Sequence, residues 1–106
     1  MVNNSKETLS IIRNSVISLF PDCRVILFGS RARMDNSTES DYDFLIITKN
    51  AIDIRKRRFY KSLLRKQLAK HKIPADIIIQ SEKEVQKKKE ITGHIIKEVI
   101  KEGIAL

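Results

Sequence analysis

Residues 24–48 read RVILFGSRARMDNSTESDYDFLIIT, and this stretch decides the fold. It contains two short runs rich in β-branched, aliphatic and aromatic residues, 24–28 and 43–48, which are typical of buried strands. Gly29 ends the first run, and an entirely polar segment from Asp35 to Ser40 separates the two. We therefore predict two strands joined by a turn and a solvated loop. The link is short enough to allow an antiparallel pair.

Helical patterns flank this stretch on both sides. Before it, apolar residues recur at three- and four-residue spacing from Leu9 to Phe20, and Asn4 and Glu7 have the spacing of a capping box. After it, an amphipathic helix is predicted from Ile54 to about His71. Its basic residues fill the positions outside the apolar stripe, and we assign both of its aromatic residues, Phe59 and Tyr60, to packing.

The last third of the chain predicts one more strand and one more helix. Residues 75–80 include three consecutive isoleucines, which favour a central strand. Ser81 and Glu84 have capping-box spacing, and Gly103 can end the helix. The apolar stripe of that helix is Ile91, Ile95, Ile96, Val99 and Ile100. Alternating helices and strands predict an α/β fold, with a small mixed sheet of about three core strands packed with helices.

Length and composition limit the classes of protein. A chain of 106 residues can form one compact domain and is too short for two cores, so residues 1–106 are expected to be a single domain. A large binding surface would need a second copy of the chain or another protein. One cysteine, Cys23, and no secretory leader favour a cytoplasmic setting. No apolar run approaches the roughly 18 residues of a membrane span.

Positive charge is concentrated in one segment. The chain has 21 basic and 13 acidic residues, and ten of the basic ones lie between Lys49 and Lys72, where Asp53 is the sole acid. This predicts one positive face that attracts acidic proteins, nucleotides or nucleic acids. Nucleic acid is the least favoured of these, because aromatic residues for base stacking make up only 6% of the chain.

Three aspartates are placed where strands begin. Asp41 and Asp43 project to the same side of the second strand, with Cα atoms roughly 6.5 to 7 Å apart. Asp76 starts the third strand and can join them if the two strands are neighbours. Like charges this close repel, and carboxylate oxygens suit Mg²⁺ or Mn²⁺. The cluster therefore predicts a divalent metal site.

The turn after the first strand complements these acids. Gly29 lets the backbone approach a ligand, and the amides that open a short helix after it can point at phosphate oxygens. Ser30 can add a hydroxyl donor. Arg31 and Arg33 occupy alternate positions and will not both face the ligand, so Arg33 is a weaker candidate than Ser30.

Together these motifs resemble the signature of the nucleotidyltransferase superfamily related to DNA polymerase β. The resemblance rests on Gly29-Ser30, on Ser40-Asp41-Tyr42-Asp43 with the apolar strand that follows, and on Asp76. It covers roughly residues 25–79, and the ending 101–106 is also similar to that of the minimal nucleotidyltransferases.

The resemblance implies a site and a reaction. The three aspartates would hold two Mg²⁺ ions, and Gly29 and Ser30 would bind the triphosphate. A hydroxyl would attack the α-phosphorus and pyrophosphate would leave, with Asp76 as the candidate base. Many family members have glycine where this chain has Met34. Methionine disfavours positive φ, so the bend is expected elsewhere, at Asn36.

Minimal family members resemble the antitoxin half of two-gene modules whose partner is an all-helical HEPN protein. The resemblance implies transfer of AMP from ATP to a tyrosine of that partner. Two alternatives stay open: a partner-binding protein without catalysis, and a nucleic-acid-binding module that uses the basic helix. His71 and His94 are expected at the surface or at helix ends, Cys23 as a small buried residue, and Tyr42 as a packing residue on the face opposite the aspartates.

Overall fold

The computed structural model describes residues 6–106, in which helices and strands alternate except for two successive helices near the C-terminus. The elements are α1 (Lys6–Leu19), β1 (Arg24–Phe28), α2 (Gly29–Arg33), β2 (Tyr42–Thr48), α3 (Ile54–Ala69), β3 (Ala75–Ser81), α4 (Glu82–Lys88), α5 (Ile95–Glu102) and β4 (Ile104–Ala105). Asn4, half of the capping box predicted for the first helix, lies outside the described residues. None of the described helices is long and apolar enough to cross a membrane.

The sheet is mixed, as predicted, and its four strands have the order β3-β2-β1-β4. β1 pairs antiparallel with β2 and with β4, whereas β2 and β3 are parallel. The prediction of a central third strand was wrong, because β3 lies at an edge. Its isoleucines are explained by burial on both faces: Ile77 and Ile79 belong to one core cluster and Ile78 packs against the other.

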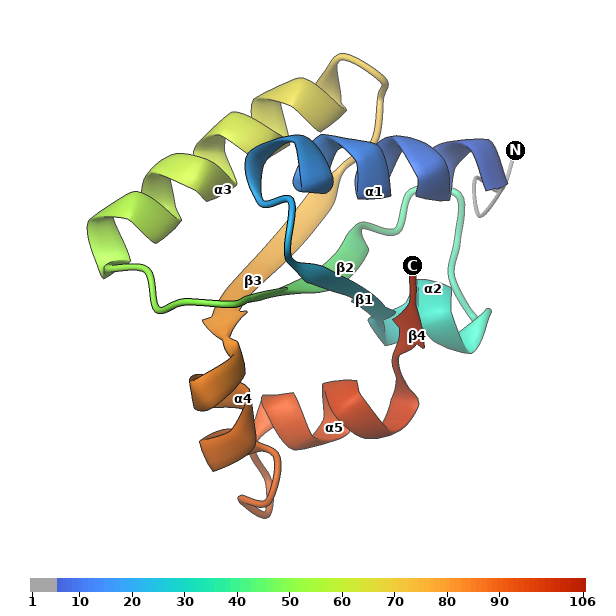
Figure 1. The fold of residues 1–106 in the computed structure, drawn as a ribbon. Helices are drawn as coiled ribbons and strands as arrows, with labels where there is room; N and C mark the ends of the chain where they lie inside the picture. Colours follow the sequence, from blue (N-terminus) through green and yellow to red (C-terminus); the bar gives the residue numbers. More distant parts are fainter. Residues whose placement is uncertain (1–5) are drawn as a thin grey trace.

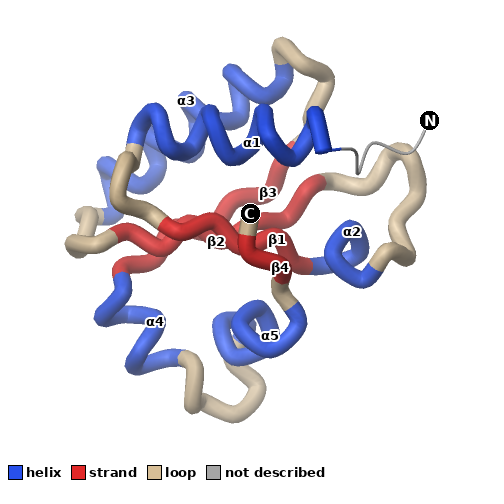
Figure 2. Tube along the Cα trace, turned by 45° about the vertical axis from the view of Figure 1, so that its right-hand side comes forward, coloured by secondary structure: helices blue, strands red, loops and turns tan. Residues whose placement is uncertain are grey.

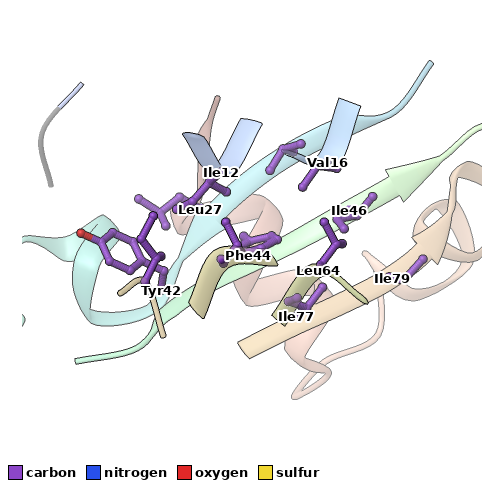
Figure 3. Close-up of a cluster of buried hydrophobic side chains, with 12 residues drawn as sticks. Ile12, Val16, Leu27, Tyr42, Phe44, Ile46, Leu64, Ile77 and Ile79 are labelled. Atoms are coloured by element: carbon purple, nitrogen blue, oxygen red, sulfur yellow. The ribbon is translucent and has the colours of Figure 1, made fainter. Parts of the chain in front are cut away.

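Helices cover both faces of the sheet, as Figures 1 and 2 show: α1 and α3 lie on one side, α4 and α5 on the other. The larger core lies beneath α1 and α3, where Ile12, Leu64 and Phe44 are fully buried (Figure 3). The smaller core joins Leu45 of β2 to Ile96 of α5 and other buried residues. Alternate residues of β2 therefore serve opposite cores.

The basic helix α3 begins at a capped end. Asp53 caps it, because its Oδ1 accepts a hydrogen bond from the Lys56 amide at 2.9 Å. Tyr60 packs edge-on against Phe20, with ring centroids 4.8 Å apart. Phe59 makes an edge contact with Tyr60, with ring centroids 5.6 Å apart, but it is 62% exposed and does not belong to the core as predicted. It precedes the buried Leu64 by five residues, which places it on the outer side of the helix.

The last predicted helix is in fact two helices. The capping box of Ser81 and Glu84 is present and starts α4. Residues 89–94 then break the helix, and Ile91 lies in this break rather than in a helical segment. His94 begins α5 as its N-cap, with Nδ1 accepting from the Ile96 amide at 3.1 Å. The break lets both helices pack their apolar residues onto one sheet face, whereas a single straight helix would leave it.

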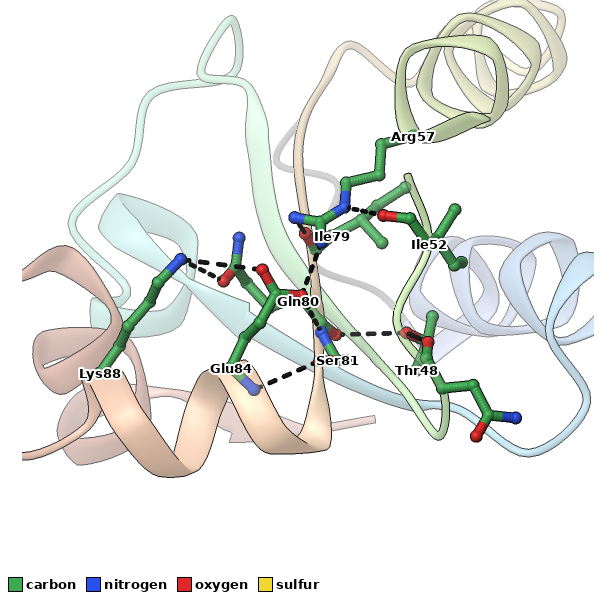
Figure 4. A network of polar contacts seen from close by, with 9 residues as sticks. Thr48, Ile52, Arg57, Ile79, Gln80, Ser81, Glu84 and Lys88 are labelled. Atoms are coloured by element: carbon green, nitrogen blue, oxygen red, sulfur yellow. Dashed lines mark hydrogen bonds and ion pairs between the residues drawn. The ribbon is translucent and has the colours of Figure 1, made fainter. Parts of the chain in front are cut away.

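A polar clamp, formed by Arg57, Glu84 and the backbone they bind, joins α3, β3 and α4 at the far end of β3 from Asp76 (Figure 4). The Arg57 guanidinium donates to the carbonyls of Ile52 at 2.6 Å and Ile79 at 3.2 Å, and to the Glu84 carboxylate at 2.6 Å. The same carboxylate accepts from the Ser81 amide at 3.0 Å. This clamp fixes how α3 lies along β3.

Candidate active site

The three aspartates gather at one end of the sheet. β2 and β3 run parallel and begin together, and Asp43 lies directly beside Asp76 in their register. β1 ends at the same place, because Phe28 pairs with Asp43. The condition set by the sequence, a third strand next to the second, is met. Asp41 precedes β2 and is two residues from Asp43, on the same side.

These aspartates lie on the α5 side of the sheet. Tyr42 and Ile77, their neighbours in sequence, are buried in the core beneath α1 and α3. Side chains alternate along a strand, so Asp43 and Asp76 point to the opposite face. Tyr42 is 1% exposed, which confirms its expected packing role. Burial raises the pKa of the Tyr42 hydroxyl, although the charge of Arg31 opposes the shift.

The charges of the site influence one another. Burial raises the pKa of Asp43, the negative charges of Asp76 and then Asp41 raise it further, and the positive charge of Arg33 opposes them. Asp43 is half-buried, whereas Asp41 and Asp76 are exposed. Asp76 belongs to the edge strand β3, and its Oδ1 lies 3.7 Å from Nη2 of Arg65 in α3.

The oxygen atoms of these carboxylates are chemically suited to a divalent cation, although the side chains are not grouped closely enough to hold one. Among residues 6–106, no three His, Cys, Asp or Glu side chains form a group that could hold a metal ion. Asp41 and Asp76 are exposed, and exposed side chains change rotamer within picoseconds to nanoseconds. A cation bound between the carboxylates would offset the burial and the repulsion that together raise the pKa of Asp43. Hard oxygen donors are the ligands that Mg²⁺ takes.

Gly29 lies against Asp43. Its φ is +73°, in the left-handed region, and a Cβ built there would clash with the Asp43 carboxylate. Only glycine meets both demands without strain. Ser30 follows in the first turn of α2, and its carbonyl accepts from the amides of Met34 and Asp35. The predicted turn and short helix therefore stand directly beside the aspartates.

Met34 makes the bend that was predicted at Asn36, so that prediction was wrong. Met34 has φ 64° and ψ 27° at the C-cap of α2. Among the described residues, only Met34 and Lys72 combine a side chain with positive φ. The Met34 amide closes the helix onto the Ser30 carbonyl, which offsets a conformational cost of about 1–2 kcal/mol. Its side chain is 72% exposed and unbranched at Cβ, so it meets little crowding there.

The two arginines of the turn have different roles. Arg31 is buried, and it donates to the Ser40 carbonyl at 2.8 and 3.0 Å and to the Thr38 carbonyl at 3.3 Å. Its guanidinium lies 3.9 Å from the centroid of the Tyr42 ring. Arg31 thus holds the polar loop and the residue next to Asp41, a role that the sequence analysis missed. No local pattern marks an arginine that binds carbonyls seven and nine residues further along the chain.

Arg33, in contrast, is exposed on the side of the aspartates. It donates to Asp35 at 3.1 Å, and its Nη1 lies 3.9 Å from Glu102 of α5. A groove of about 360 Å³ opens between α2 and α5. Its lining is Phe28, Gly29, Arg33, Ile95, Glu98, Val99 and Glu102. Because Gly29 lines this groove and touches Asp43, the groove adjoins the aspartates.

The resemblance rested on the Gly29-Ser30 turn and on the aspartates near the starts of β2 and β3. In the structure these motifs lie side by side. The sequence profile described as the nucleotidyltransferase domain matches residues 9–106, nearly the whole chain. The chain belongs to this family. Its expected α/β fold is confirmed, and so is its expected class of activity, nucleotidyl transfer.

A solved structure supports the assignment of this chain to the nucleotidyltransferase family. The chain is similar to the crystal structure of a candidate nucleotidyltransferase from Sulfolobus solfataricus, with a TM-score of 0.63 and 25% sequence identity. The similarity covers 93% of this chain and 76% of that one. A search of the curated proteins found no match.

Proposed function

We propose that this nucleotidyltransferase transfers AMP from ATP to a hydroxyl group of a protein partner. The observation that carries the proposal is the position of Asp43, which lies beside Asp76 in the sheet and against Gly29. This proximity supports a role for the aspartates as metal ligands and for the turn as the phosphate-binding element. The expected acceptor is a tyrosine of a HEPN-type helical protein, in keeping with the resemblance to minimal nucleotidyltransferases.

Each residue of the site has a proposed role. Gly29 and Ser30 bind the triphosphate, through the amides that open α2 and through the serine hydroxyl. Arg33 adds positive charge on the same side. Asp41, Asp43 and Asp76 would hold two Mg²⁺ ions, or Mn²⁺ in their place, and these ions would supply positive charge that favours attack on the phosphate.

Asp76 is the proposed base that acts on the acceptor hydroxyl. Its side chain is 64% exposed at an edge strand, where a residue of another protein can reach it. Asp76 takes the proton of the acceptor hydroxyl while the acceptor oxygen bonds to the α-phosphorus. The bond from that phosphorus to the pyrophosphate oxygen breaks, and pyrophosphate leaves past the Gly29–Ser30 turn.

A labelling experiment tests this reaction. The purified chain is incubated with Mg²⁺ and with ATP that carries the label on either the α- or the γ-phosphate. The protein encoded by the adjacent reading frame serves as one acceptor, and a glutamate–tyrosine copolymer serves as a second. We expect label from the α-phosphate on the acceptor, release of pyrophosphate, and loss of both with Asp43→Asn.

Two other results would contradict the proposal. Transfer of the γ-label would show a kinase rather than a nucleotidyltransferase. No transfer at all, with a stable complex that Asp41→Asn and Asp43→Asn leave intact, would favour a protein that neutralises its partner by contact alone. Gel filtration of the mixed proteins distinguishes this second result from failed mixing.

A further inference from the structure

We propose that the outer face of α3 is the docking surface for the acceptor protein, and that it recognises an acidic surface containing apolar residues. The proposal rests on the proposed function and names the side from which the acceptor reaches Asp76. α3 lies over the sheet on the side of β3, the edge strand that carries Asp76 (Figures 1 and 2). We refer to Arg58, Phe59, Lys61, Ser62, Leu63, Arg65 and Lys66 as the α3 face.

The charge of the α3 face is one-sided. Residues 54–69 contain seven basic residues and no acidic one. A groove of about 370 Å³ on this helix is lined by Arg58, Lys61, Ser62, Arg65 and Lys66. Among the described residues, Arg65 alone of these four cations forms an ion pair. Closely spaced cations repel one another, so an acidic partner would relieve that repulsion.

Apolar side chains lie beside these cations. Phe59 is 62% exposed and Leu63 is 39% exposed. The two are four residues apart, so they are neighbours along one strip of the helix, and Lys66 continues that strip. Exposed aromatic side chains next to arginines are typical of the residues that anchor protein–protein interfaces.

This mixture favours a protein over a nucleic acid. Phosphate groups would pair with the cations, and a base could stack on Phe59, but neither would bury Leu63. A protein surface with carboxylates around an apolar centre would satisfy both parts of the α3 face. Acidic proteins are therefore the class of partner that the surface fits.

The α3 face is connected to the candidate active site through Arg65. Its guanidinium lines the α3 groove and also lies 3.7 Å from the Asp76 carboxylate. Both side chains are more than half exposed, so water screens the pair and a carboxylate of the partner can compete for Arg65. Docking would then release Asp76 beside the incoming hydroxyl. Positive charge on α3 would thus both recruit the acceptor and expose the aspartate.

The test measures binding of a fluorescent glutamate–tyrosine copolymer by anisotropy near physiological salt. The test variants are the double variant Arg58→Glu, Lys66→Glu and the single variant Phe59→Ala, all at exposed positions. A matched control, Lys83→Glu, Lys87→Glu, makes the same change of charge at exposed positions of α4. Titration of ATP with Mg²⁺ into every variant reports on the nucleotide site separately, and thermal melting checks folding.

We expect affinity for the copolymer to fall about tenfold or more in the α3 double variant, and to fall also in Phe59→Ala. The α4 control should change it by less than about twofold, because its charges lie outside the docking surface. ATP binding should be equal in all of them. These results together would support the α3 face as the acceptor site.

Three results would overturn the proposal. Equal losses in the α3 and α4 double variants would show unspecific attraction to net charge. Binding of polyuridylate, but not of the copolymer, with the same dependence on α3 would assign the surface to nucleic acid. A wild-type chain that binds the copolymer through α3 but does not bind ATP would remove the proposed function, and the acceptor role with it, while leaving a binding surface.

Discussion

At the scale of single residues, Gly29 is the position of the site where substitution should be tolerated least. Its positive φ and its contact with Asp43 are separate constraints. Gly93 offers a matched control, because it also has positive φ, at +81°, but a Cβ there would meet nothing within 4 Å. Comparing alanine at the two positions separates the cost of the conformation from the cost of the contact.

We expect Gly93→Ala to lower the free energy of unfolding by about 1 kcal/mol, from backbone strain alone. Gly29→Ala should cost about 2–3 kcal/mol and should also displace Asp43, so that binding of ATP with Mg²⁺ is lost. Urea denaturation and calorimetry measure the two effects. Equal stability losses, with nucleotide binding intact in both variants, would show that Gly29 has no close contact to protect.

Asp43 should make the protein less stable when it is ionised and no metal is bound. Its pKa is raised in the folded state, by burial and by Asp76 and Asp41. Its contribution to stability is therefore greatest below the ordinary value of 3.8 and is lost as the pH rises through the higher folded value. Asp43→Asn should raise the free energy of unfolding at pH 7 by about 0.5 kcal/mol after allowance for solvent screening.

This gain should shrink as the pH falls toward 4, because wild-type Asp43 then becomes protonated. Urea titrations of both proteins at pH 7 and pH 4, without divalent metal, give the comparison. A variant that is less stable than wild type at pH 7 would mean that neither burial nor the neighbouring carboxylates destabilise ionised Asp43. Saturating Mg²⁺ should reverse the order of stability, because only the wild type binds it.

The positions of the site residues could be predicted from the sequence where they follow from spacing along a strand. Alternation placed Asp41 and Asp43 on one side, and a polar residue opening an apolar run marked Asp76. The roles of Arg31 and Met34 were not predictable. They depend on a buried contact with a later loop and on a cap that offsets an unfavourable φ, and neither leaves a periodic pattern.

At the scale of elements, the polar clamp should matter more than surface ion pairs. Burial alone would raise the pKa of Glu84, but hydrogen bonds from the Ser81 amide and the Arg57 guanidinium outweigh it and lower the pKa. Arg57→Ala should lower the free energy of unfolding by about 2 kcal/mol, because several hydrogen bonds from one charged group are lost. Arg55→Ala, at an exposed position of the same helix, should change it by less than about 0.5 kcal/mol.

The pH dependence of the clamp has the opposite sign to that of Asp43. A lowered carboxyl pKa adds stability above the ordinary value of 4.5, and that stability is lost as the pH falls through the folded value. The difference between wild type and Arg57→Ala should therefore narrow in urea titrations below pH 4.5. A constant difference from pH 7 to pH 3 would show that the Glu84 charge does not take part.

Elements with strong periodicity were predicted well. α1, β1, β2 and α3 lie close to their predicted ranges, because each carries a clear apolar pattern. The break between α4 and α5 could not be seen, because the isoleucine spacing continues across it and only tertiary packing turns the chain. β4 has two exposed residues, too few for any pattern.

At the scale of the whole molecule, the sheet separates two surfaces that meet at Asp76. The aspartates and Gly29 face α5, whereas the positive charge lies on α3, on the other side. Arg65 connects them at the edge of β3. We propose that this layout lets one protein bind a nucleotide on one side and an acidic acceptor on the other, with the reacting groups at their boundary.

The class of fold and activity could be predicted from motifs in order along the chain, since Gly29-Ser30, the aspartate pair and Asp76 occur together. The lateral order of the strands could not, because burial on both faces gives edge and central strands the same apolar composition. The base of the nucleotide and the identity of the acceptor could not be predicted from the sequence either. They depend on surfaces that form only when separate elements come together.

The measurement that tests the central claim most directly is calorimetric titration of ATP, with and without Mg²⁺, into three proteins. They are the wild type, the double variant Asp41→Asn, Asp43→Asn, and the control Asp22→Asn, Glu90→Gln, which removes two exposed charges elsewhere. We predict binding that requires Mg²⁺, that the first double variant loses and that the control retains. Binding without metal, or binding that survives in Asp41→Asn, Asp43→Asn, would contradict a metal-dependent nucleotide site at these aspartates.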